Sequence, residues 1–235
     1  MPKKIAIIGT GISGLSCAHY LAKHSDAELS IFEKSDRVGG HTATVNIVLG
    51  GKRYAIDTGF IVFNDRTYPN FVKLLDELGV ESQDSEMSFS VRAESDDIEY
   101  GRTEFSGLFA QKRNLLRPSH WRMLIDITRF NRLALADLEN GSISPEMSLG
   151  DYLEKRRFSK AFRDRYLVPM GSAIWSASSK TILDFPILFF AKFFKNHGLL
   201  TLTDQPQWKV IKGGSKSCLS PLIAPFSKAI NTNTT

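Results

Sequence analysis

Three glycines near the N-terminus have the spacing of a phosphate-binding turn: Gly9, Gly11 and Gly14. In a unit of strand, turn and helix, the first glycine permits a tight turn, the second lets the backbone approach a pyrophosphate, and the third lets the helix pack against the strand. The apolar run Lys4–Ile8 predicts that strand, which we expect to be buried. A pyrophosphate would then lie on the exposed N–H groups and the positive end of the following helix.

An acidic residue follows at the distance that suits a ribose. Glu33 comes 24 residues after Gly9, directly behind a second apolar segment, residues 29–32. A carboxylate at this position accepts hydrogen bonds from ribose hydroxyls. The stretch between the glycines and the acid is amphipathic and predicts a helix. Its inner face is predicted to carry Leu15, Ala18, Leu21 and Ala22. Together these features indicate a dinucleotide site rather than a glycine turn without a ligand.

A second glycine pair directly after the acid bears on which dinucleotide binds. Enzymes of this kind that bind NAD need only the first glycine turn. Here Arg37, Gly39 and Gly40 would add backbone amides and a cation near the same phosphates. That doubling favours FAD.

The same segments resemble the FAD-binding half of the flavin amine oxidase superfamily, which also holds protoporphyrinogen oxidases and phytoene desaturases. The resemblance spans the chain and is carried by the glycine turn, Glu33, and residues 37–40, 55–59 and 208–215. Similarity to bacterial amine-oxidase-like proteins is carried by residues 57–64, 87–91 and 174–177. The cofactor contacts that the resemblance implies are Gly9, Gly11, Ile12, Ser13, Gly14, Glu33, Lys34, Arg37, Gly39, Gly40, His41, Thr42, Gly59 and Phe60.

The chain departs from the family pattern at two positions. Many amine oxidases carry an arginine two residues after the ribose acid and a basic residue after the double glycine, where this chain has Ser35 and His41. The resemblance therefore implies backbone contacts there. In such families a later strand also meets the adenine and a much later glycine-rich segment covers the flavin, whereas this sequence ends at Thr235. We expect the N-terminal portion of a longer flavoprotein, truncated at its C-terminal side.

The resemblance implies an FAD-dependent oxidoreductase of the amine-oxidase type, in which hydride passes from substrate to flavin. Two alternatives stay open: a flavin-dependent desaturase or isomerase acting on a lipid-like substrate, and a catalytically silent flavin-binding fragment. No catalytic residue is predicted, because no Ser/His/Asp or Cys/His arrangement stands out. The five histidines lack metal-ligand spacing, so no metal is expected, and His19 is expected near solvent.

A phenylalanine-rich segment, residues 182–200, bears on the substrate, which we expect to be a small molecule, either an amine or lipid-like. The apolar stretch between Asp184 and Lys192 is too short to span a bilayer, which needs about 20 residues. We predict a helix capped by Asp184, with Pro186 in its first turn and Gly198 at its end. A core helix is favoured over an interfacial one, and peripheral membrane contact stays open. Its four phenylalanines, Phe189, Phe190, Phe193 and Phe194, cannot all face one way.

Composition limits the partners and the compartment. The net charge of +5 is concentrated in residues 112–132 and 155–165, where helical spacing favours solvated faces and no nucleic-acid motif accompanies the arginines. No nucleic-acid partner is therefore expected. Cys17 and Cys218 form no disulfide framework, and Cys17 is expected to pack inside. The N-terminus has no apolar signal segment. We predict a cytoplasmic protein.

The order of these patterns predicts an α/β fold: a Rossmann-like FAD-binding domain with an inserted, mainly helical α+β substrate domain. The predicted parts are residues 1–85 (FAD-binding domain), 86–205 (substrate domain) and 206–235 (return to the FAD-binding domain). Further expected elements are a hairpin turning at Gly50 and Gly51, a helix at 68–79, and strands at 201–211 and 229–231. Residues 214–224 are expected to be helical.

Overall fold

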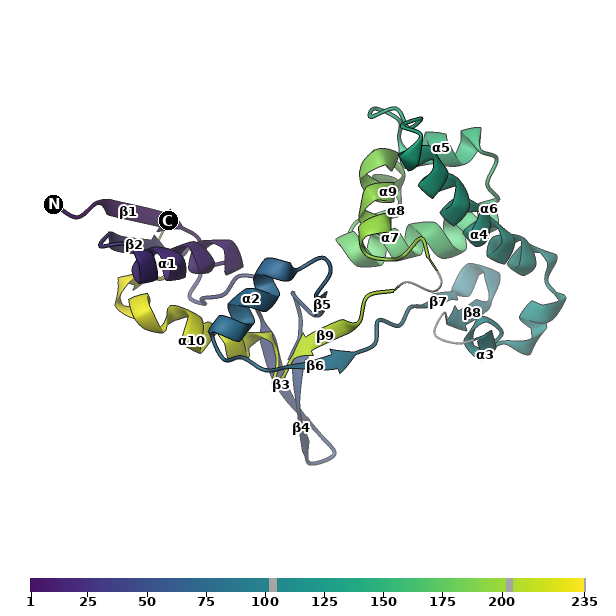
Figure 1. Ribbon diagram of the computed structural model, residues 1–235. Helices are drawn as coiled ribbons and strands as arrows, with labels where there is room; N and C mark the ends of the chain where they lie inside the picture. Colours follow the sequence, from purple (N-terminus) through teal and green to yellow (C-terminus); the bar gives the residue numbers. More distant parts are fainter. Residues whose placement is uncertain (102–104, 202–204, 235) are drawn as a thin grey trace. The chain divides into compact units, whose positions relative to one another are not determined.

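The computed structural model describes residues 1–101, 105–201 and 205–234 (Figure 1). The chain divides into two compact units. Unit 1 comprises Met1–Glu86 and Gln207–Thr235, and unit 2 comprises Met87–Pro206. Each division lies one residue beyond the boundary expected from the sequence. The ligands assigned to the two parts remain predictions.

Unit 1 combines a parallel sheet with antiparallel strands. Its strands are β1 (Lys4–Ile8), β2 (Glu28–Phe32), β3 (Thr44–Leu49), β4 (Lys52–Asp57), β5 (Phe63–Asn64), β6 (Ser82–Ser85), β9 (Trp208–Ile211) and β10 (Ile230–Asn231). Its helices are α1 (Ile12–His24), α2 (Pro69–Glu77) and α10 (Leu219–Ile223), with 3₁₀ turns at Ser215–Cys218 and Ala224–Ala229.

The first strand, helix and second strand form the predicted unit. β1 and β2 run parallel in register from Lys4 opposite Glu28, and β10 joins the other edge of β2. Parallel neighbours require a crossover, which α1 supplies. In Figure 1, α1 lies along β1 and β2, and it also packs against α10. Leu15, Ile31 and Leu222 are fully buried in this core.

The inner face of α1 differs from the predicted one. Leu15, Ala18 and His19 are buried, whereas Leu21 is half-buried and Cys17 is exposed. The expectations that His19 lies near solvent and that Cys17 packs inside are therefore wrong. His19 is buried because its Nδ1 lies 3.1 Å from the carbonyl oxygen of Leu222, so α10 supplies a polar partner inside the core.

β1 is less buried than the sequence predicts. Its hydrogen-bonded neighbour among the described strands is β2 alone, so its other edge is unpaired there. Ile7 packs into the core with α1, but Ile8 is 81% exposed. The expectation of a buried strand holds for one face and is wrong for the other, because within the described residues nothing covers that face.

The hairpin forms as predicted. β3 and β4 pair antiparallel from Thr44 opposite Asp57 to Leu49 opposite Lys52. Gly50 and Gly51 have φ values of 58° and 77°, in the left-handed region that two-residue hairpin turns require.

The chain returns to unit 1 through an antiparallel sheet in the order β5, β9, β6. The strand expected over 201–211 is present only as β9, and residues 202–204 lie outside the described part of the chain. The helix expected at 68–79 is α2, in which Leu74 and Leu75 are buried.

Unit 2 is mainly helical. Its helices are α3 (Phe105–Leu108), α4 (Pro118–Glu139), α5 (Leu149–Lys155), α6 (Lys160–Phe162), α7 (Val168–Trp175), α8 (Ser179–Leu183) and α9 (Ile187–Asn196). A short π-helix, Arg163–Leu167, joins α6 to α7, and 3₁₀ turns lie at Glu94–Asp96 and Lys112–Leu116. The strands β7 (Ser90–Ala93) and β8 (Ile98–Gly101) pair antiparallel. No described helix has both the length and the apolar character needed to cross a membrane.

The phenylalanine-rich segment is a core helix that begins later than predicted. Asp184 follows the end of α8, and Pro186 caps α9, so the expectation that Asp184 caps the helix is wrong. The first residues of the segment belong to the end of α8, whose N-cap Ser178 accepts a hydrogen bond from the Thr181 N–H. The prediction that the four phenylalanines do not all face one way is confirmed, and contact of the exposed ring with a substrate remains a prediction. Phe190 and Phe194 are buried, whereas Phe189 is 52% exposed.

Candidate functional site

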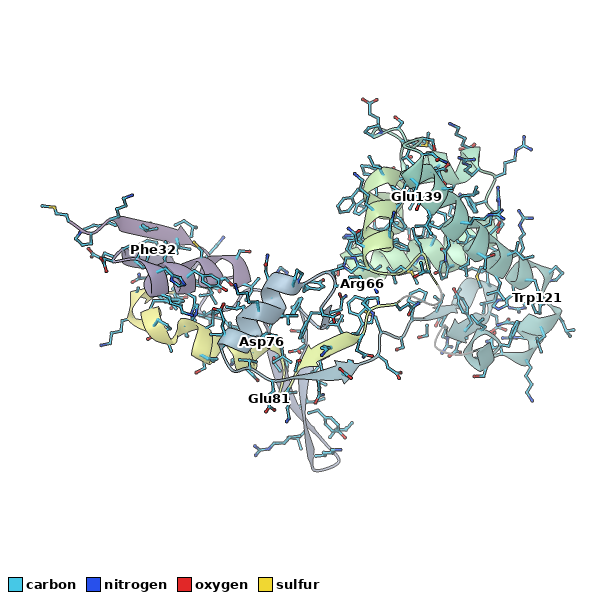
Figure 2. All side chains as sticks on the ribbon, in the orientation of Figure 1. Phe32, Arg66, Asp76, Glu81, Trp121 and Glu139 are labelled. Atoms are coloured by element: carbon cyan, nitrogen blue, oxygen red, sulfur yellow. The ribbon has the colours of Figure 1, made fainter. Side chains whose placement is uncertain are left out.

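In the glycine turn between β1 and α1, the backbone geometry requires glycine at positions 9 and 14. Gly9 has φ +92°, which side chains rarely permit, and its N–H donates to the carbonyl oxygen of Phe32 at 2.7 Å. Phe32, labelled in Figure 2, ends β2. A Cβ on Gly14 would lie 2.2 Å from the carbonyl oxygen of Gly9. The strand and the helix therefore approach this closely only with glycine at 14.

Gly11 is different, because the protein leaves the space beside it open. A Cβ built there meets no heavy atom within 4 Å. Gly11 is also the N-cap of α1, where no side chain caps the helix and no acidic residue lies in the first turn. The N–H groups of Ile12 and Ser13 and the positive helix end are thus available to an anion. This open cradle fits a phosphate group.

Glu33 is held as an anion beside this turn. Its Oε2 accepts from the Thr10 N–H at 2.8 Å and the Thr10 hydroxyl at 2.5 Å. Its Oε1 accepts from the Ser35 N–H and the Ser35 hydroxyl, each at 3.0 Å. The backbone N–H of Ser35, followed by the Thr10 hydroxyl, lowers the pKa of Glu33 to about 2. In the sequence analysis, Thr10 and Ser35 are not predicted as hydrogen-bond partners of Glu33.

We expect the Glu33 carboxyl to titrate near pH 2 in the wild-type chain. In Thr10→Val, which keeps the backbone donor and loses the hydroxyl, its pKa should rise. Because the pKa is lowered in the folded chain, the stabilisation is present above the ordinary glutamate pKa of about 4.3 and is lost as pH falls toward 2. Carboxyl ¹³C NMR titration measures both values, and an unchanged pKa in Thr10→Val would contradict this account.

The second glycine pair packs directly on the first turn. The Gly39 N–H donates to the carbonyl oxygen of Thr10 at 3.0 Å, and a Cβ on Gly40 would lie 3.0 Å from the Gly11 Cα. The Arg37 guanidinium donates to the carbonyl oxygens of Gly40 at 2.7 Å and Thr42 at 3.4 Å. These hydrogen bonds from Arg37 stabilise the loop of residues 37–42 and place the positive charge of the guanidinium beside it.

A third segment, between β4 and β5, lies against the same loop. The Phe60 N–H donates to the carbonyl oxygen of His41 at 2.9 Å. A Cβ on Gly59 would lie 2.3 Å from that oxygen, so only glycine permits this approach. The Phe60 ring packs against Phe63, Tyr68 and Phe71 and serves the core.

The structure thus brings most of the predicted cofactor residues into three adjoining loops. Thr42 is buried, whereas the Lys34 and His41 side chains are exposed. The contacts of all these residues with a cofactor remain predictions.

The return segment is fixed to the hairpin by a carboxylate that the predicted contact set does not include. Asp57 Oδ1 accepts from the Thr44 hydroxyl at 2.6 Å, the Ser215 N–H at 2.8 Å and the Ser215 hydroxyl at 2.9 Å. Asp57 thereby accepts from the first backbone N–H of the 3₁₀ turn Ser215–Cys218. Nearby Cys218 is buried, which raises the pKa of its thiol to about 11, so it stays protonated at neutral pH.

Comparison with known proteins assigns this part of the chain. Residues 7–78 match the family described as NAD(P)-binding Rossmann-like domain. The strands and helices within this region have the Rossmann-like arrangement. This domain contains both glycine loops and Glu33, and it implies a flavin or dinucleotide cofactor. The predicted Rossmann-like fold class is confirmed.

Curated relatives match the N-terminal region. Prenylcysteine oxidase 1 of Bos taurus is 48% identical over 48 residues, which cover 20% of this chain and 9% of that protein. The 15-cis-phytoene desaturase of Synechococcus elongatus is 36% identical over 80 residues, which cover 34% of this chain and 16% of that protein. Both matches are therefore to a small part of a longer relative.

A solved structure matches nearly the whole chain. Cyclohexylamine oxidase of Brevibacterium oxydans superposes with a TM-score of 0.66 at 19% identity, over 99% of this chain and 51% of that one. At this identity the likeness establishes the fold. The predicted resemblance to the N-terminal portion of flavin amine oxidases is confirmed at that level, and the chain spans about half the length of this structural relative.

Proposed function

We propose that this chain is the FAD-binding portion of an FAD-dependent oxidoreductase of the amine-oxidase type, in which a small-molecule substrate gives up hydride to the flavin. The observation that carries the proposal is the packing of two glycine loops on each other at Gly11 and Gly40, beside an uncapped helix N-terminus and the ionised Glu33. A site for NAD needs only the first loop.

Each part of the site has a role in this proposal. The N–H groups at the start of α1 and the open side of Gly11 receive the pyrophosphate. Glu33 keeps its charge and accepts from ribose hydroxyls, and Thr10 and Ser35 fix its orientation. The backbone from Gly39 to Thr42 adds donors. When bound, FAD supplies the two-electron chemistry, while the protein supplies binding and orientation.

Titration of the purified chain with FAD and with NAD⁺ by calorimetry tests the cofactor. We expect FAD to bind at least about tenfold more tightly, a difference of about 1.4 kcal/mol. Equal affinities, or tighter binding of NAD⁺, would contradict the assignment to FAD.

The class of substrate distinguishes two candidate enzymatic functions, an amine oxidase and a desaturase or isomerase. The similarity to cyclohexylamine oxidase supports an amine, whereas the similarity to a phytoene desaturase supports a desaturase or isomerase with a lipid-like substrate. The second candidate is also supported by unit 2, where the half-exposed ring of Phe189 packs against Trp175 and Phe185. Hydrogen peroxide release on addition of amines would favour the first candidate. Double-bond formation in an apolar substrate would favour the second.

A catalytically silent flavin-binding fragment is the remaining alternative, and stable FAD binding without flavin reduction by either substrate class would support it.

We further propose that unit 1 holds the cofactor and unit 2 contacts the substrate. A cytoplasmic location is supported by the two free thiols, Cys17 and Cys218.

A further inference from the structure

Four exposed apolar side chains gather where the 3₁₀ turn Lys112–Leu116 leads into α4. Leu115 is 48% exposed, Leu116 86%, Trp121 42% and Ile125 57%. Figure 2 labels Trp121 at the periphery of unit 2, near the start of α4, with Glu139 labelled at the other end of this helix. Ile125 follows Trp121 by one helical turn, so both lie on one face. We call these four residues the α4 corner.

Hydrogen bonds and ring contacts hold the α4 corner in place. The Trp121 indole N–H donates to the carbonyl oxygen of Leu115 at 2.9 Å, which ties the helix to the turn before it. The Trp121 ring also lies 5.2 Å from that of Phe109, between centroids. Within the turn, the side chain of buried Asn114 donates to the carbonyl oxygen of Glu99 at 3.2 Å. The four exposed side chains of the α4 corner therefore project from a backbone that these contacts stabilise.

Positive charge surrounds the α4 corner. Residues 112–132 contain six basic residues and one acidic residue, Asp126. Asp126 is fully buried and bonded to Arg122, so it presents no negative charge to solvent. Lys112 and Arg132 are exposed, and Arg132 lies two turns beyond Ile125 on the same face.

Two of the neighbouring acidic groups are paired with arginines. Asp97 pairs with Arg113 at 2.5 Å, and Asp96 pairs with Arg165 at 2.8 Å. The basic residues in the sequence around the α4 corner outnumber these acids.

We propose that the α4 corner docks on the surface of an anionic lipid bilayer. Apolar side chains that project from a basic surface combine two signals, insertion into the acyl boundary and attraction to lipid phosphates, and stable peripheral binding takes two. Trp121 suits such an interface because its ring is apolar and its N–H already has a partner. This surface is independent of the dinucleotide site, so the proposal stands or fails separately from the proposed function.

Co-sedimentation of the chain with vesicles tests the proposal, using phosphatidylglycerol mixed with phosphatidylcholine against phosphatidylcholine alone. The wild-type chain should bind the mixed vesicles and not the neutral ones. The double variant Leu116→Ser/Ile125→Ser should bind about tenfold more weakly because it removes the inserted apolar groups. Lys112→Glu should bind about fivefold more weakly or more, and higher salt should weaken wild-type binding.

Matched controls remove equally exposed groups elsewhere. Val48→Ser/Leu49→Ser alters two hairpin residues that are 67% and 68% exposed, and Lys228→Glu reverses an exposed charge in unit 1. Both should bind vesicles as the wild type does. Absence of wild-type binding, or equal losses in the control and corner variants, would overturn the proposal. So would a dimer without vesicles that Leu116→Ser/Ile125→Ser dissociates, since the corner would then bind a second copy.

Discussion

Replacing Gly11 with alanine is expected to weaken FAD binding about 100-fold and to leave the fold intact. The backbone at Gly11 has φ −66° and ψ 171°, which alanine adopts without strain. Its Cβ would meet no protein atom within 4 Å, so the new methyl group would occupy the open space that we propose for the pyrophosphate. Because alanine is a poorer N-cap than glycine, we expect the free energy of unfolding to fall by no more than about 1 kcal/mol.

Gly14→Ala is the informative contrast. Its Cβ would lie 2.2 Å from the carbonyl oxygen of Gly9, so the turn or the helix must shift. We expect a destabilisation of about 1–3 kcal/mol or more, with loss of FAD binding as a consequence. Gly101→Ala is the matched control, since its Cβ would make only ordinary contacts from 3.9 Å. Calorimetric titration with FAD and thermal unfolding separate the three variants. Wild-type FAD affinity in Gly11→Ala would contradict the position of the pyrophosphate.

The sequence predicts the glycine turn, the acid and the hairpin because each depends on neighbours within a few residues. Gly9 follows the strand whose end it turns, and Gly50 and Gly51 supply the positive φ values that the hairpin needs. Such requirements appear directly as residue types at short spacing.

The contacts that the sequence analysis missed join segments distant in the chain. Asp57 holds Ser215 across 158 residues, and His19 is buried because Leu222 offers a carbonyl oxygen. Neither contact can be predicted from the spacing of residue types within one segment. The contact of Thr10 with Glu33 could have been predicted more easily. Thr10 lies between the first two glycines, and its hydroxyl reaches the carboxylate that follows the adjacent parallel strand. The exposure of β1 likewise depends on which strands lie beside it and not on its own apolar pattern.

Within unit 2, the four phenylalanines of α9 should divide sharply in their contribution to stability. Phe194 is 1% exposed and its ring stacks on that of Phe190 at 4.2 Å between centroids. Phe194→Ala should therefore lower the free energy of unfolding by about 3–5 kcal/mol, through lost burial and the cavity left behind. Phe189 is 52% exposed, so Phe189→Ala should change it by no more than about 0.5 kcal/mol.

Urea unfolding followed by tryptophan fluorescence measures both effects, because the Trp175 ring lies 6.4 Å from that of Phe194 and 6.0 Å from that of Phe189. The conservative variant Phe194→Leu should recover part of the loss, since it refills most of the cavity. If the proposed apolar substrate contacts unit 2, Phe189→Ala should weaken its binding while stability is kept. Equal stability losses in Phe189→Ala and Phe194→Ala would contradict the division of α9 into a core face and an exposed face.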